Sequence, residues 1–95
     1  MAKTKIKTNI KTETVPQLDT RWNVLVLNDP INYQQYVVLA FMTVLRVERS
    51  VADKLMLAIH NDGRAIVWSG NREPAEMIAL ELQQWHLQAQ LEKDA

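Results

Sequence analysis

Apolar and polar positions form distinct blocks from residue 22 onward, and the first block is a run of bulky apolar residues. The sequence WNVLVL at residues 22–27 is rich in β-branched and aromatic side chains, which favours a largely buried strand. The strand should end at Asn28-Asp29-Pro30, because proline has no N–H to donate to a sheet and disfavours helix in the residue before it.

A nearly continuous apolar segment follows and predicts a first helix over residues 33–46. Asn32 is its expected N-cap, because an asparagine side chain can accept from the first free N–H groups of a helix. Gln35 stands at the third helical position, as in a capping box. Residues 36–45 are apolar nearly all round the helix, so the helix should be buried on most sides or present a second apolar face to a ligand.

Capping signals bound a second helix and place a strand after it. Ser50 is the expected cap, with Asp53 in the first turn, where the helix dipole favours an acid. The helix should end at Asp62, because Gly63 suits the left-handed position that follows a helix. The second strand is predicted at residues 64–68.

A third helix and a third strand complete the pattern. Asn71 is the expected cap, and Pro74 falls in the first turn, where helical N–H groups have no partner within the helix. The apolar stripe of this helix recurs at helical spacing and consists of Ala75, Ile78, Ala79, Leu82 and Trp85. Residues 87–91 alternate strictly between apolar and polar, which predicts a half-buried strand.

The resulting order, β-α-α-β-α-β, predicts an α+β fold in which a three-stranded antiparallel sheet packs against three helices on one face. The folded domain should span residues 21–95. Residues 1–20 are dominated by Lys and Thr and are predicted to be a flexible N-terminal tail. On composition alone, the simpler interpretation is that this tail is merely solvated.

Composition narrows the function classes. With 95 residues the chain has room for one domain, and it contains no cysteine, hence no disulfide or thiolate metal site. Residues 1–12 carry four lysines and no acid, which leaves seven basic against eleven acidic residues, a net charge of −4, in residues 13–95. That sign matches a phosphate backbone poorly, so no nucleic acid is expected. We expect a cytoplasmic monomer, with no membrane span and no signal peptide.

Residue patterns typical of catalysis are missing from the sequence. Gly63 and Gly70 are the only glycines, so there is no glycine-rich phosphate loop, and His60 and His86 have no metal-ligand spacing around them. The sequence therefore predicts a protein that is not an enzyme and needs no metal or cofactor.

A polar cluster beside apolar residues is the best candidate site. Asn28 and Asp29 follow the first strand, while Met56 and His60 share one face of the second helix, with Ile59 beside them. If that helix packs beside the end of the strand, three acceptors would ring an apolar hollow, which suits an ammonium group attached to a bulky hydrophobic side chain. Each residue also has a simpler interpretation: a turn for Asn-Asp-Pro, a helix-terminus residue for His60 and core for Met56.

Four segments together resemble the ClpS family. They are WNVLVLND at residues 22–29, MLAIHNDGRAIV at 56–67, REPAE at 72–76 and LEK at 91–93, and their order and spacing match over about residues 20–93. The resemblance implies a non-enzymatic adaptor in the bacterial N-end rule. Such adaptors bind destabilising N-terminal residues (Leu, Phe, Tyr or Trp) and deliver their substrates to a Clp AAA+ ATPase, of ClpA or ClpC type, and its ClpP protease for degradation.

The resemblance also implies roles for particular residues. The α-amine contacts of the family fall on Asn28, Asp29 and His60. Its hydrophobic pocket falls on six positions: Asn32, Gln34, Val37, Met56, Ile59 and Leu87. Glu73 matches an acidic position that faces the ATPase, and residues 1–20 match a tail used in delivery.

Five positions depart from the family pattern. Pro30 replaces a second Asp, Asn32-Tyr33 replaces Thr-Pro, and Gln34 replaces a rim Met, which bears on the preferred first residue. Ile78 replaces a basic residue on the ATPase-facing helix, which bears on the partner. The alternative function is an interaction module of the same fold that docks on a Clp ATPase or the ribosome without reading N-termini.

Overall fold

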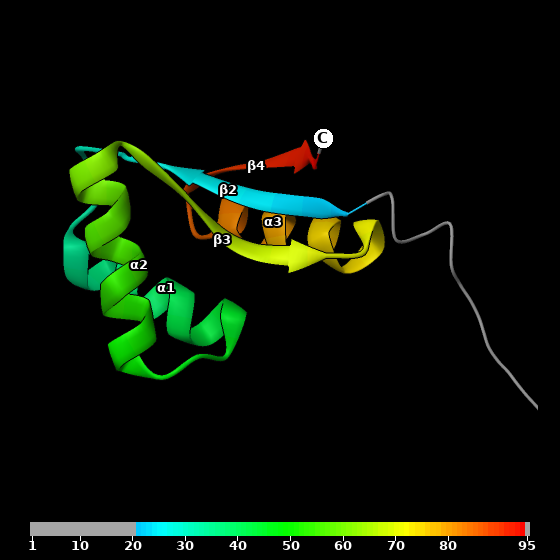
Figure 1. The fold of residues 1–95 in the computed structure, drawn as a ribbon. Coiled ribbons are helices and arrows are strands. Elements are labelled where there is room, and N and C mark those ends of the chain that lie inside the picture. The colour runs from blue at the N-terminus through cyan, green and yellow to red at the C-terminus, as the bar shows by residue number, and fades with distance from the viewer. Residues whose placement is uncertain (1–20, 95) are drawn as a thin grey trace, which may run out of the picture.

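The structure, a computed structural model, describes residues 21–94 and shows a three-stranded sheet and three helices within that range (Figure 1). The elements are β2 (Trp22–Leu27), α1 (Gln34–Leu45), α2 (Arg49–Asp62), β3 (Arg64–Gly70), α3 (Arg72–Gln84) and β4 (Gln88–Lys93). The predicted order and the α+β class are confirmed. The predicted tail, residues 1–20, lies outside the described residues, as does residue 95.

β2 is the central strand of the sheet, and β3 and β4 both pair with it in antiparallel fashion. Leu27 at the end of β2 is in register with Arg64 at the start of β3 and with Gln88 at the start of β4. The carboxyl end of β2 therefore lies beside the chain that leaves α2 and the chain that leaves α3. This edge of the sheet is where the candidate pocket forms.

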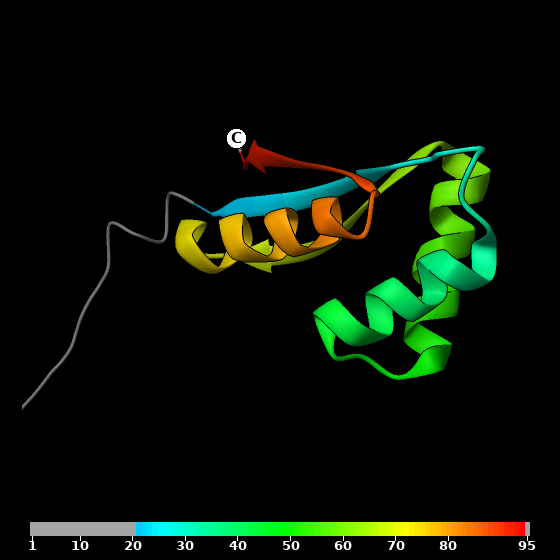
Figure 2. The same ribbon diagram turned by 180° about the vertical axis from the view of Figure 1, so that it is seen from behind.

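The three helices lie on the same side of the sheet but cover different parts of it. α3 runs along the strands, whereas α1 and α2 form a pair beyond the end where β2 stops and β3 begins (Figures 1 and 2). This arrangement confirms the prediction of helices on one face. It also leaves α1 and α2 free to form walls around the end of β2.

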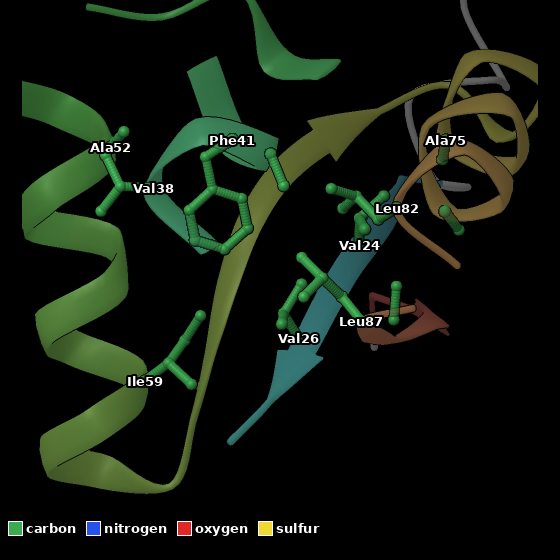
Figure 3. Packing of buried hydrophobic residues seen from close by; sticks show 12 residues of the cluster. Val24, Val26, Val38, Phe41, Ala52, Ile59, Ala75, Leu82 and Leu87 are labelled. Atoms are coloured by element: carbon green, nitrogen blue, oxygen red, sulfur yellow. The ribbon is translucent and has the colours of Figure 1, made fainter. Parts of the chain in front are cut away.

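Apolar side chains from every layer meet in one core. Its largest fully buried members are Phe41 from α1, Leu82 from α3, and Val24 and Val26 from β2. In Figure 3 the ring of Phe41 lies between Val38 and the sheet, and Leu82 reaches Val24 from α3. Burying such side chains contributes about 1.5–3 kcal/mol each, so this core holds the two helical regions on the sheet.

Two of the predicted helix caps are wrong. Tyr33, not Asn32, occupies the N-cap position of α1, and its side chain makes no capping hydrogen bond. The Asn32 amide instead donates to groups outside the helix. Helix α2 begins at Arg49 after Glu48, so Ser50 lies inside the first turn and Asp53 lies beyond it. In both cases the N-cap position falls one or two residues away from the polar residue that the sequence suggested as the cap.

Other boundaries hold or move by a few residues. Gly63 follows α2 with a φ of 87°, the left-handed conformation predicted for it, and its N–H donates to the Ile59 carbonyl (2.8 Å). Strands β3 and β4 continue to Gly70 and Lys93, past the predicted 64–68 and 87–91, because Trp22 at the start of β2 pairs with both. Asn71 stands at the N-cap of α3 as predicted, without a side-chain capping bond.

Candidate functional site

The site begins where β2 stops, at Asn28. Its backbone N–H donates to the Gly63 carbonyl (2.9 Å), which fixes the end of β2 against the end of α2. His60 lies in the last turn of α2, one turn before Gly63. Asn28 and His60 are therefore brought to the same edge of the sheet, as the sequence predicted, although neither is close to the other along the chain.

Asp29 is held by its own turn. One carboxylate oxygen, Oδ1, accepts from the Ile31 N–H (2.9 Å), and the other, Oδ2, accepts from the Asn32 side-chain amide (3.2 Å). The side chain is half-buried. A carboxylate has about four acceptor positions, so each oxygen keeps capacity for another donor. The interpretation of Asn-Asp-Pro as a turn and that of Asp29 as a ligand group are therefore compatible.

Asn32 connects this turn to a distant part of the chain. Besides Asp29, its amide donates to the His86 carbonyl (3.2 Å), in the connection between α3 and β4. His86 has a left-handed φ of 68°. Because both donors of the Asn32 amide are used in this way, the amide anchors the turn, and this accounts for the wrong prediction that Asn32 caps α1.

A second connection ties α1 to the same region. The Tyr36 hydroxyl donates to the Trp85 carbonyl (2.7 Å), and the two rings lie 5.5 Å apart at 53°. The tilted arrangement is favourable for aromatic pairs. These contacts place Leu87, two residues after Trp85, near the start of α1, where it lines the same pocket as Gln34 and Val37.

These elements enclose one pocket of about 370 Å³, within the usual range of about 300–1,000 Å³ for small-ligand sites. It contains all nine residues predicted for the amine contacts and the hydrophobic pocket: Asn28, Asp29, Asn32, Gln34, Val37, Met56, Ile59, His60 and Leu87. Sequence reasoning missed four further lining residues, which are Val26, Leu27, Pro30 and Tyr33. Leu27, Pro30 and Tyr33 are each next in sequence to a residue already assigned to the site, and that proximity was the available signal. Val26 lies two positions before Asn28, so its side chain points to the same face of the strand.

The pocket has a polar mouth and an apolar floor. Asn28 and His60 are exposed and Asp29 is half-buried at the mouth, whereas Ile59 and Leu87 are only 4% and 5% exposed at the floor. Ile59 also belongs to the core and points from α2 toward the sheet (Figure 3). Chemically, the arrangement offers hydrogen-bond acceptors and one negative charge beside a hydrophobic hollow.

Glu73 lies apart from this pocket. It is an exposed residue in the first turn of α3. Ile78, which stands where the family pattern has a basic residue, is half-buried and packs against the core. Among residues 21–94 there is no group of three or more His, Cys, Asp or Glu side chains that could hold a metal ion. No helix in the described part of the chain is long and apolar enough to cross a membrane.

Comparison with known proteins identifies the family. The family model described as "ATP-dependent Clp protease adaptor protein ClpS" matches residues 17–92. The chain belongs to the ClpS family. A ClpS adapter protein of Streptomyces avermitilis is 40% identical over 80 residues, covering 84% of this chain and 76% of that protein. The ClpS adapter protein of Mycobacterium tuberculosis H37Rv is 36% identical over 76 residues, covering 80% and 75%. Membership makes the chain an adaptor of the Clp protease system.

A solved ClpS structure has the same fold. Agrobacterium tumefaciens ClpS2, bound to L-phenylalaninamide, matches with a TM-score of 0.77. The match covers 80% of this chain and 99% of that chain at 23% sequence identity. The β-α-α-β-α-β arrangement of residues 21–94 is therefore that of the ClpS family.

Proposed function

We propose that this ClpS-family protein captures substrates by a free N-terminal Leu, Phe, Tyr or Trp. It then delivers them, as a cytoplasmic monomer, to a Clp AAA+ ATPase and its ClpP protease. One observation carries the proposal: a single pocket combines three acceptor side chains at its mouth with an apolar floor. L-Phenylalaninamide, the molecule bound by the Agrobacterium relative, has a free amine next to an aromatic side chain. Its amine is complementary to the acceptors at the mouth, and its aromatic side chain is complementary to the apolar floor.

The α-amine is the feature that separates a chain terminus from an internal residue. Its reference pKa is about 7.7–8.0, so at neutral pH it is mostly a cation with three donors. Asn28, Asp29 and His60 supply an amide oxygen, a carboxylate and a ring nitrogen as acceptors. Specificity then arises from two requirements met together, because an internal residue has no ammonium group and would leave the Asp29 charge without a cationic partner in a partly desolvated site.

The first side chain should occupy the floor of the pocket. The floor is lined by apolar side chains: Val37 and Met56, which are half-buried, and Ile59 and Leu87, which are buried. The surface that meets the ligand there is therefore apolar. Burial of apolar area stabilises a complex by about 25 cal/mol per Å². Large side chains such as those of Leu and the aromatic residues therefore gain most, and small or charged first residues gain little.

N-terminal acetylation tests this mechanism directly. Peptides that differ only in their first residue, each with a free or an acetylated N-terminus, are titrated into the protein by calorimetry. Free peptides beginning with Leu or an aromatic residue should bind, and acetylation should abolish binding because it removes the charge and leaves Asp29 against a neutral amide. Equal binding of free and acetylated peptides would contradict the proposal and favour a docking module that does not read N-termini.

Delivery should use other parts of the chain. Glu73 is exposed and lies outside the pocket, so it is available to face an ATPase while a substrate is bound. Residues 1–20 are proposed to act in delivery and not in capture. Removal of residues 1–17 should leave peptide affinity nearly unchanged while degradation by the cognate protease stops. Glu73→Ala should weaken ATPase binding, again without loss of peptide affinity. Full-rate degradation with the truncated protein would contradict the role of the tail.

A further inference from the structure

Two side chains beside the pocket are unusually exposed for their type. Ile31 is 85% and Tyr33 is 83% exposed, whereas the other large hydrophobic side chains classed as exposed in residues 21–94 range from 43% to 59%. Single exposed hydrophobic residues are ordinary on protein surfaces. Here, however, the two most exposed ones lie two positions apart on the turn that also carries Asp29.

The backbone that presents these side chains is held in place. The Ile31 N–H donates to the Asp29 carboxylate (2.9 Å), and the Tyr33 carbonyl accepts the first helical bond of α1, from the Val37 N–H (3.1 Å). Asn32, between them, is anchored to the His86 carbonyl (3.2 Å). The exposed residues therefore sit on a fixed turn, and little backbone freedom would be lost if a ligand contacted them.

Tyr33 places this turn beside the opening through which a bound chain would leave the pocket. If the first residue binds as proposed above, its amine is at the Asn28, Asp29 and His60 edge and its side chain is in the floor. Its carbonyl carbon must then point out of the opening. An extended chain advances about 3.3 Å per residue, so the second side chain lies just outside the mouth. Tyr33 lines the pocket and is itself exposed there.

We propose that Ile31 and Tyr33 form a subsite for the second residue of the substrate, with a preference for apolar and aromatic side chains. This inference rests on the proposed function and deepens it, because it extends the recognised motif from one residue to two. A tyrosine ring offers a large contact area with few rotatable bonds, so it suits adaptable recognition of such side chains at low entropic cost. The occupant is the substrate chain itself, because the turn is continuous with the pocket that binds its first residue.

A mutant cycle between protein and peptide tests the subsite. Free-amine peptides beginning Leu-Phe and Leu-Ala, identical elsewhere, are titrated into the full chain, Tyr33→Ala and Ile31→Ala. The wild-type protein should bind the Leu-Phe peptide about three- to tenfold more tightly than the Leu-Ala peptide. That ratio should fall to about one in Tyr33→Ala and decrease in Ile31→Ala. The ratio isolates the contact with the second residue from any general change in affinity.

Met77→Ala is the matched control, because Met77 is 59% exposed but lies on α3 and is not a pocket residue. It should keep the wild-type ratio. If Tyr33→Ala and Ile31→Ala also keep it while Leu-Ala peptides still bind, the subsite is wrong and the proposed function stands. If neither peptide binds the wild-type protein, the proposed function fails and the subsite with it. If the variants keep the wild-type peptide affinities but lose a concentration-dependent self-association seen by sedimentation, the turn is a contact between copies of the chain and the subsite is wrong.

Discussion

The mouth and the floor of the pocket are built by different kinds of interaction. At the mouth, Asp29 is placed by hydrogen bonds within one short turn, and His60 is exposed at the end of a helix. At the floor, Ile59 and Leu87 are buried members of the hydrophobic core. The same pocket is therefore bounded on one side by residues outside the hydrophobic core and on the other by residues that belong to it.

This difference separates binding from stability. A substitution at the mouth should change how strongly a ligand binds and leave the fold intact. A substitution at the floor should weaken both, because it removes core packing and reshapes the cavity at once. The variants below test that contrast, and their expected effects decrease in size from one to the next.

Ile59→Ala should have the largest effect. Ile59 is 4% exposed and lines the pocket, and truncation of buried isoleucine costs about 2–5 kcal/mol of stability. Urea unfolding should show that loss, and calorimetry should show weaker peptide binding where the variant is still folded. Ile66→Ala is the matched control: Ile66 is 48% exposed on β3 and is not a pocket residue. It should cost about 1 kcal/mol or less. Equal losses in the two variants would remove the distinction between floor and surface.

Asp29→Asn should lose affinity while remaining folded. Asparagine keeps the size and one acceptor oxygen for the turn but removes the charge that the α-amine needs. Loss of a hydrogen bond to a charged group costs about 1.5–3 kcal/mol, or about ten- to a hundredfold in affinity. His60→Ala should lose less, because it removes no opposite charge. Asp62→Asn, an exposed acid near the same end of α2, is the control and should change affinity little. A loss that accompanies unfolding would instead assign Asp29 a purely structural role.

Asn32→Ala should weaken binding through Asp29. The substitution removes the donor to the carboxylate and the donor to His86, so the turn loses its anchor. One of these hydrogen bonds goes to a carboxylate and the other to a backbone carbonyl, and because both act on the ligand only through the turn, we expect about a five- to tenfold loss of affinity. If Asn32 acts by positioning Asp29, the loss should largely disappear when it is measured in the Asp29→Asn background. Additive losses in the double variant would mean that Asn32 contributes to the pocket in its own right.

The sequence correctly predicted an element or its end where the local residues alone determine the conformation. The apolar run of residues 22–27 correctly predicted the strand, and Gly63 correctly predicted the end of α2, because glycine adopts the left-handed φ of 87° without the steric cost of a side chain. These two elements also set the site. Once β2 ends beside α2, Asn28, Asp29 and His60 have to share one edge of the sheet.

Predictions from local sequence failed where a residue distant in the chain bonds the side chain or pairs with the end of the strand. Asn32 has the chemistry of a cap, but its amide reaches His86, 54 positions along the chain, and nothing in the local pattern reveals that partner. The lengths of β3 and β4 depend on Trp22, which pairs with both strands. The register shift between Val24 and Leu25 likewise arises only when two strands meet. Tertiary contacts of this kind have no signature within a window of a few residues.

Gln34→Met should give the smallest effect, and it tests which first residues the pocket prefers. Gln34 is an exposed pocket residue at the first position of α1, where the family pattern has a methionine. Gln and Met are similar in length, but a polar amide is expensive to bury unless it finds partners. In the present chain the amide should lean toward solvent, or bond a polar atom of the ligand.

Methionine at this position should therefore add apolar contact at the rim. Calorimetric titration should show Leu and Phe peptides binding about three- to fivefold more tightly to Gln34→Met, the scale of one buried methylene. Tyr peptides should gain less, because their hydroxyl loses the amide as a partner. Gln35→Met is the matched control, since Gln35 is the next residue, is exposed, and does not line this pocket. If Gln34→Met tightens every peptide equally, or none, then Gln34 does not set the preference, and Val37, Met56 and the other apolar walls must do so.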